Sequence, residues 1–176
     1  VNTLLKKRLF SSPAAFASTL EKHYATLTTG KTKPVSDGMS ERILRKAILR
    51  AEEDYADDGQ VEAAQTEAVE EATKRSAPLT DEEKRLLSRM RDWAQRASHR
   101  TDSKAKAILD WIEANLKTGG QWNDRRVILF TEYRTTHQWL HEILATSGYG
   151  GDRLSIIHGG MDQEEREKVK AAFQTN

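Results

Sequence analysis

Two short segments in the C-terminal part of the chain place polar residues directly after apolar runs. RVILFTEYR (126–134) ends one run in polar side chains, and RLSIIHGG (153–160) ends another in a histidine and two glycines. If both runs are strands of a parallel sheet, Thr131, Arg134 and His158 lie at its ligand-binding edge, beyond the carboxyl ends of the strands. Paired glycines before a helix also let backbone N–H groups approach a phosphate. A tight turn needs glycine in any case, so HGG alone is a weak signal.

Other chemistries find little support in the sequence. Neither G-x-x-x-x-G-K-[ST] nor G-x-G-x-x-G is present, and the GKT at 30–32 lacks the earlier glycine and the preceding strand of a phosphate loop. His137 and His141 are one helical turn apart, but such pairs without a catalytic glutamate are more often surface or half-buried residues than metal ligands. No serine lies in a nucleophile elbow, and the absence of cysteine excludes disulfides and thiolate metal sites. We therefore assign no catalytic and no metal-binding residue.

The elements that would position these residues alternate regularly from residue 102 onward. We predict a helix capped by Asp102, a strand at 126–131, a helix in THQWLHEIL, a second strand in RLSIIHGG and a final helix. The final helix is expected to begin at Asp162, with Glu165 in the capping-box position. Helix, strand, helix, strand, helix is typical of a parallel α/β sheet.

Residues 1–101 are predicted to be almost entirely helical and to form a small bundle or an antiparallel hairpin. Ser11 or Ser12 caps a helix that Pro13 opens, and a second helix begins at Ser40. A helix with few large apolar residues follows, and a capping box of Thr80 and Glu83 opens the last one. The buried stripes expected for the first and the last of these helices are Phe16, Leu20 and Tyr24, and Leu86, Leu87, Met90, Trp93 and Ala97.

Charge is distributed unevenly along a chain whose net charge is only +1. Residues 1–50 hold 10 basic and 3 acidic side chains, residues 51–73 hold 9 acidic and none that is basic, and residues 74–117 hold 11 basic and 7 acidic. The basic segments suit a nucleic-acid backbone, although solvated helix faces are the better explanation of the charge taken alone. No apolar run approaches the length of a membrane span, and the N-terminus is not a signal peptide. With the lack of cysteine, these features favour the cytoplasm and no membrane partner.

The C-terminal segments, in their order along the chain, resemble the start of the second RecA-like domain of superfamily 2 helicases. The resemblance is greatest to the Swi/Snf-like DNA translocases and the related bacterial helicases. Motif IV of that family is matched by 127–132, its glycine turn by HGG, and its Q-x-x-R helix by Gln163 and Arg166. DSKAKAILDWI resembles the helix that leads into this domain, and LLKKRLFSSPAAFASTLEKH resembles the segment that joins the two RecA-like domains. Residues 30–100 match only as a family-variable helical insertion.

The resemblance implies a helix-dominated α/β fold with two parts. Residues 1–101 would be a helical inter-domain region, and 102–176 the N-terminal half of a RecA-like domain with a partial parallel sheet. The implied activity is that of an ATP-dependent helicase or translocase acting on nucleic acid, with DNA expected rather than RNA. The implied nucleic-acid contacts are Thr131, Arg134, His158, Gly159, Gly160, Gln163 and Arg166. For Gly160, Gln163 and Arg166, a structural role in the turn or in helix packing is the alternative.

The motifs that bind ATP and Mg²⁺ in the family are absent from this sequence. The resemblance therefore places both cofactors in a longer parent protein, and we expect no ATPase activity from this chain alone. The first residue is Val, and the chain ends just after the Q-x-x-R helix, so we expect an internal piece of that parent. A sheet without its next strand would have an exposed edge, which predicts pairing between copies of the chain.

Two other functions are compatible with the sequence. One is a non-enzymatic helical module in which residues 30–100 bind a protein partner through Trp93, Met90 and the acidic helix. The other is a standalone phosphate-binding α/β protein, which is the weaker alternative because two strands make a poor sheet. DNA-independent capture of a protein would favour the module, and steeply salt-dependent DNA binding would favour the motor.

Overall fold

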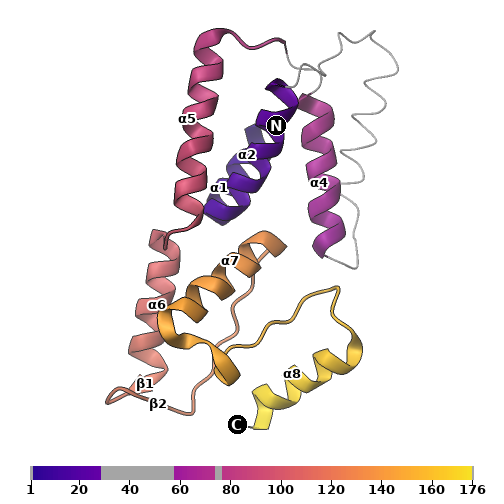
Figure 1. The fold of residues 1–176 in the computed structure, drawn as a ribbon. Coiled ribbons are helices and arrows are strands. Elements are labelled where there is room, and N and C mark those ends of the chain that lie inside the picture. Colours follow the sequence, from indigo (N-terminus) through magenta and orange to yellow (C-terminus); the bar gives the residue numbers. More distant parts are fainter. Residues whose placement is uncertain (1, 29–57, 74–76, 176) are drawn as a thin grey trace.

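The computed structural model describes residues 2–28, 58–73 and 77–175, and its regular structure is mostly helical (Figure 1). The helix predicted from Ser40 lies outside these residues. The helices and strands are α1 (Asn2–Ser11), α2 (Pro13–Thr28), α4 (Asp58–Thr73), α5 (Asp81–Ser98), α6 (Ser103–Asn115), β1 (Lys117–Thr118), β2 (Gln121–Trp122), α7 (Arg134–Leu144) and α8 (Gln163–Thr175). A kinked turn, Ala145–Tyr149, in which Gly148 has a φ of +89°, and a 3-10 turn, Gly151–Arg153, follow α7.

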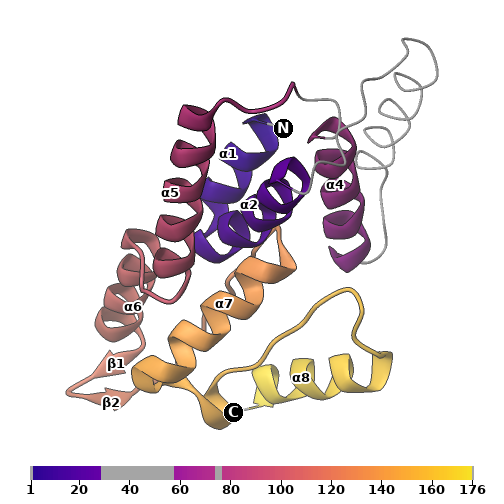
Figure 2. The same cartoon turned by 45° about the horizontal axis from the view of Figure 1, so that its top comes forward.

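Helix α2 is the centre of the N-terminal region, where α1, α4 and α5 all pack against it (Figures 1 and 2). Ser12 is its cap, because the Ser12 hydroxyl accepts a hydrogen bond from the Ala15 N–H at 3.1 Å. Pro13 occupies the first helical position, where a missing N–H costs nothing. Phe16 and Leu20 are buried along the predicted stripe. The helical character of this region is confirmed for the part that the structure describes.

Helix α5 begins where predicted, but fewer of its apolar side chains are buried than predicted. Thr80 and Glu83 form the reciprocal capping box, with the Glu83 carboxylate accepting from the Thr80 N–H at 2.8 Å. Ala94 is buried against Phe16 and Leu20, and Leu87 packs beside them. The predicted inward positions Leu86, Met90 and Trp93 remain 45–49% exposed. The reason is geometric: α5 packs along α2 through the narrow stripe that holds Leu87 and Ala94, and the neighbouring stripe faces outward.

Helices α6 and α7 bury a second core. The Asp102 carboxylate caps α6 by accepting from the Ala105 N–H at 2.7 Å, as predicted. Both helices supply this core, which consists of Ala105, Ile112, Leu116, Trp139, Leu140 and Leu144. No helix in the described part of the chain is long and apolar enough to cross a bilayer.

The predicted parallel strands are not formed. Residues 126–131 and 154–158 carry no strand assignment, and within the described residues the sheet is the antiparallel pair β1 and β2. A strand requires hydrogen-bonding partners on a neighbouring segment, and neither apolar run pairs with the other. The β1–β2 hairpin instead turns at Gly119 and Gly120, whose φ values of +61° and +80° suit glycine.

Candidate nucleic-acid interface

The first candidate segment runs into the N-terminus of α7. Thr131 and Arg134 are partly buried, Glu132 is exposed, and Tyr133 is almost fully buried. Arg134 is the first residue of α7, and within the described residues its side chain makes no hydrogen bond or ion pair. Its guanidinium group is therefore available to an anion from outside the chain.

Side chains from the α1–α2 junction fix the position of α7. The buried guanidinium group of Arg8 lies 4.0 Å from the centroid of the Tyr133 ring. The hydroxyl groups of Ser11 and Ser12 lie 2.7 and 2.8 Å from that of Thr136, in the first turn of α7. The sequence separation exceeds 120 residues in both cases, so sequence periodicity gave no signal for these contacts. They hold the start of α7, and with it Arg134, against the helical region.

The second candidate segment is a closed turn. The Met161 N–H donates to the His158 carbonyl at 3.2 Å, so residues 158–161 form a hydrogen-bonded β-turn. Gly159 and Gly160 are exposed, and neither has a positive φ. The turn therefore does not require glycine for its backbone angles, and the absence of side chains there leaves the main chain open to close approach.

Arg166 fastens this turn to α8. One terminal nitrogen of its guanidinium group donates to the carbonyls of His158, Gly159 and Met161 at 3.3, 3.2 and 3.4 Å. This geometry favours the structural alternative for Arg166, as a side chain that positions the turn rather than one that binds an external ligand. Gln163 is exposed as the first residue of α8.

The two helix N-termini near the candidate residues differ in charge. The first turn of α7 contains no acidic residue and α7 has no side-chain cap, and the nearest carboxylate in sequence is Glu132, two residues before the helix. The N-terminus of α8 is surrounded by Asp162, Glu164 and Glu165, and the Asp162 carboxylate accepts from the Glu165 N–H at 2.9 Å. A phosphate is thus better accommodated at Thr131 and Arg134, with one carboxylate nearby, than near Gln163, with three.

His137 and His158 bring the two segments together. His137 lies in the first turn of α7, and its ring centroid is 6.4 Å from that of His158, with the rings at 68°. The His158 Nδ1 atom is buried without a hydrogen-bond partner among the described residues. From the sequence, His137 was expected to be a surface or half-buried helix residue rather than a metal ligand, and no contact with His158 was predicted. The sequence does indicate that His137 lies close to Arg134, because a spacing of three residues places both in one helical turn.

The described residues contain no group of three or more histidine, aspartate or glutamate side chains arranged to hold a metal ion. The chain matches no family model, no curated protein and no solved structure. Function therefore has to be argued from the residues and from their geometry.

Proposed function

We propose that this chain is part of an ATP-dependent translocase or helicase of the Swi/Snf-like branch of superfamily 2, and that it contacts the nucleic-acid backbone. The observation that carries the proposal is the 6.4 Å contact between His137 and His158. It joins the start of α7 to the HGG turn, the two segments that the resemblance assigns to the nucleic-acid strand. We also propose that the protein is cytoplasmic and that it binds DNA in preference to RNA.

Within this proposal the candidate residues take different roles. Arg134 supplies a charged contact to a phosphate, and Thr131 supplies a hydroxyl beside it. His158 and the backbone of Gly159 and Gly160 form the opposite side of the contact. Arg166 holds the turn in place, and the acidic surroundings of Gln163 make it the weakest of the candidates.

The exposed apolar segment supports a place for residues 126–131 within a larger sheet. Ile128 is 60% exposed and Phe130 is 91% exposed, although such side chains are normally covered on both faces of a parallel strand. We propose that further strands and helices of a longer polypeptide cover them. That polypeptide would also supply the groups that bind ATP and Mg²⁺, since no residue of this chain matches the family's motifs for them.

Fluorescence anisotropy with a labelled 30-nucleotide single strand and the matching duplex tests the proposal. At low salt we expect weak binding, with a dissociation constant of about 10⁻⁵ M and a steep loss of affinity as salt rises. Replacing Arg134 with Ala removes one phosphate contact, so the slope of log affinity against log salt should fall by about one.

Arg96→Ala is the matched control, because Arg96 is exposed and lies on α5, outside the candidate interface. This control should retain the affinity and the salt slope of the unmodified chain. Equal losses in the two variants would show that the chain binds DNA through general positive charge. No binding of either DNA at low salt would reject the proposal.

A further inference from the structure

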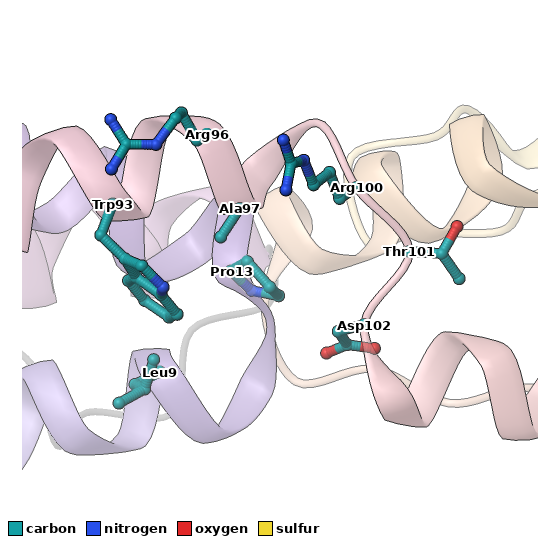
Figure 3. Close-up of a pocket in the computed structure, with 8 residues that line it drawn as sticks. All are labelled: Leu9, Pro13, Trp93, Arg96, Ala97, Arg100, Thr101 and Asp102. Atoms are coloured by element: carbon teal, nitrogen blue, oxygen red, sulfur yellow. The ribbon is translucent and has the colours of Figure 1, made fainter.

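An apolar groove with an arginine edge lies between α1 and α5, far in sequence from the proposed nucleic-acid contacts. It consists of two adjoining hollows of about 360 and 550 Å³, which share Leu9, Trp93 and Arg96. Figure 3 shows the Trp93 ring directed from α5 toward Leu9 on α1, with Arg96 and Arg100 along the α5 side. Both hollows are open to solvent, so the feature has the form of a surface groove.

The apolar residues of the groove follow a helical stripe. Leu86, Met90, Trp93 and Ala97 recur at intervals of four, three and four residues along α5, a distance of about 16 Å along the helix axis. Three of them are 45–49% exposed, and Leu9 on the opposite side is 37% exposed. Large apolar side chains gathered in one groove are typical of a binding surface.

The Trp93 ring is fixed on one side by packing and is exposed on the other. Its ring meets the buried Phe16 ring edge to face, with a centroid distance of 6.2 Å and an angle of 63°. About half of the Trp93 surface remains open to solvent. A tryptophan fixed on one side and exposed on the other loses little conformational entropy when a partner covers it.

Positive charge lies along one side of the apolar stripe. With 100° per residue, Arg89 and Arg96 fall on the flank of the stripe that points away from Ala94 and the α2 core, and Arg100 lines the same groove just after the end of α5. None of the three side chains makes a hydrogen bond or ion pair among the residues that the structure describes. Asp92 and Asp102 also line the groove, but Asp102 is occupied as the cap of α6.

We propose that this groove binds an acidic amphipathic helix of a partner protein. Its apolar face would cover Leu86, Met90 and Trp93, and its acidic flank would meet Arg89, Arg96 and Arg100. Helices dock in this way when apolar anchors recur every three or four residues. The aliphatic residues favour a peptide over nucleic acid, because bases need aromatic faces for stacking and the groove exposes one such ring.

The acidic helix of a second copy is a poorer occupant. Helix α4 has an acidic sequence, but its apolar residues Ala64, Ala68 and Val69 are already buried within the chain. The proposal therefore commits to a different protein. It does not depend on the function proposed above.

The test uses the full chain and two fluorescein-labelled 18-residue peptides. The first carries leucine at positions that repeat every three or four residues, with glutamate beside them and alanine elsewhere, and the second has lysine in place of every glutamate. We expect the acidic peptide to bind with a micromolar dissociation constant and the basic peptide at least tenfold more weakly. Equal binding of the two peptides, or no binding of the acidic one, overturns the proposal.

Variants locate the binding site. Trp93→Ala and the double variant Arg96→Ala/Arg100→Ala should each weaken acidic-peptide binding at least fivefold. The double variant changes exposed side chains, so it keeps the test valid if loss of Trp93 disturbs folding. Trp111→Ala is the matched control, because Trp111 is 47% exposed on α6 and does not line the groove, and its affinity should change less than twofold.

Two further outcomes would assign the groove to another occupant and reject the proposal. Tighter, Trp93-dependent binding of a thymidine 15-mer than of the acidic peptide would assign it to nucleic acid. Sedimentation that shows a dimer which Trp93→Ala dissociates would assign it to a second copy of the chain. The Arg134→Ala variant should bind the acidic peptide normally, which separates this surface from the proposed DNA contact.

Discussion

Arg166 matches the Q-x-x-R motif of the helicase resemblance, but its side chain contacts backbone carbonyls of the neighbouring turn. One terminal nitrogen of its guanidinium group is directed at three carbonyl groups, and its Nε is buried without a hydrogen-bond partner among the described residues, so the side chain faces its own turn. The sequence identified the residue, but the direction of its side chain depends on the turn eight residues earlier. Arg134, with no partner among the described residues, is the more open cation of the two.

Replacing Arg166 with Ala should therefore lower stability. We expect the free energy of unfolding to fall by about 1 kcal/mol, because the carbonyls of the turn lose a charged hydrogen-bond donor. Urea unfolding followed by circular dichroism measures this change.

Lys168→Ala on the same helix is the control for Arg166→Ala. Lys168 pairs with Glu164 at 2.7 Å, but its side chain is 70% exposed, and such pairs contribute little to stability. If both variants unfold at the same urea concentration, the assignment of Arg166 to the turn is wrong. The salt slope of DNA binding should stay unchanged in Arg166→Ala, since we assign it no phosphate contact.

At the scale of elements, a charged cluster holds the β1–β2 hairpin beside α6. The Glu113 carboxylate accepts from Lys117 Nζ at 2.7 Å and from the Tyr149 hydroxyl at 2.8 Å. The Trp122 ring meets Tyr149 edge to face, with a centroid distance of 5.7 Å. Hydrogen bonds from Lys117 and then from Tyr149 hold the pKa of Glu113 below its usual value.

This cluster should make the hairpin sensitive to acid. Because the pKa of Glu113 is lower in the folded chain than in the unfolded one, its contribution to stability is present above the unfolded pKa. That contribution is lost as the pH falls through the folded value, below the ordinary glutamate range. The Trp122 indole signal in NMR spectra should therefore shift on acidification.

Two variants test whether Glu113 is the group responsible for the acid transition. Glu113→Gln should remove the shift of the Trp122 signal, because the titrating group is gone. Asp110→Asn should preserve it, since Asp110 pairs with Lys106 at 2.7 Å on the same helix and makes no hydrogen bond or ion pair with the hairpin among the described residues. Persistence of the transition in Glu113→Gln would assign it to another group.

Local signals in the sequence predicted elements well where the interaction lies within one helix. The caps Ser12, Thr80, Asp102 and Asp162 all accept the expected backbone hydrogen bonds. Strands were predicted less well because they depend on a second segment. The apolar run 126–131 has the composition of a buried strand but pairs with no segment among the residues that the structure describes, whereas the hairpin at Gly119 and Gly120 needs only a local turn.

For the whole molecule, the helix-dominated architecture followed from periodicity, but the placement of the candidate site did not. The contacts that position α7 join Arg8 to Tyr133 and Ser12 to Thr136, across more than 120 residues of sequence. No local pattern encodes such distances. The same holds for α5, whose apolar stripe was predicted to be buried and instead lines an open groove.

The two proposed surfaces give the chain a division of roles. One surface, at the start of α7 and the HGG turn, would contact a nucleic-acid backbone, and the α1–α5 groove would bind a protein helix. The contacts of α1 and α2 with α7 place both on one continuously packed set of helices (Figure 2). The two surfaces share no residue, so binding at one can be measured while the other is altered by substitution.

The central claim is that nucleic acid meets this chain at the start of α7 and the HGG turn. Its most direct test is a titration of the ¹⁵N-labelled chain with a short DNA single strand, followed by the backbone amide signals in NMR spectra. We expect the largest shifts at Thr131, Arg134, His158 and Gly159, with the α5 signals unchanged. Shifts confined to α5, or no shifts at low salt, would contradict it.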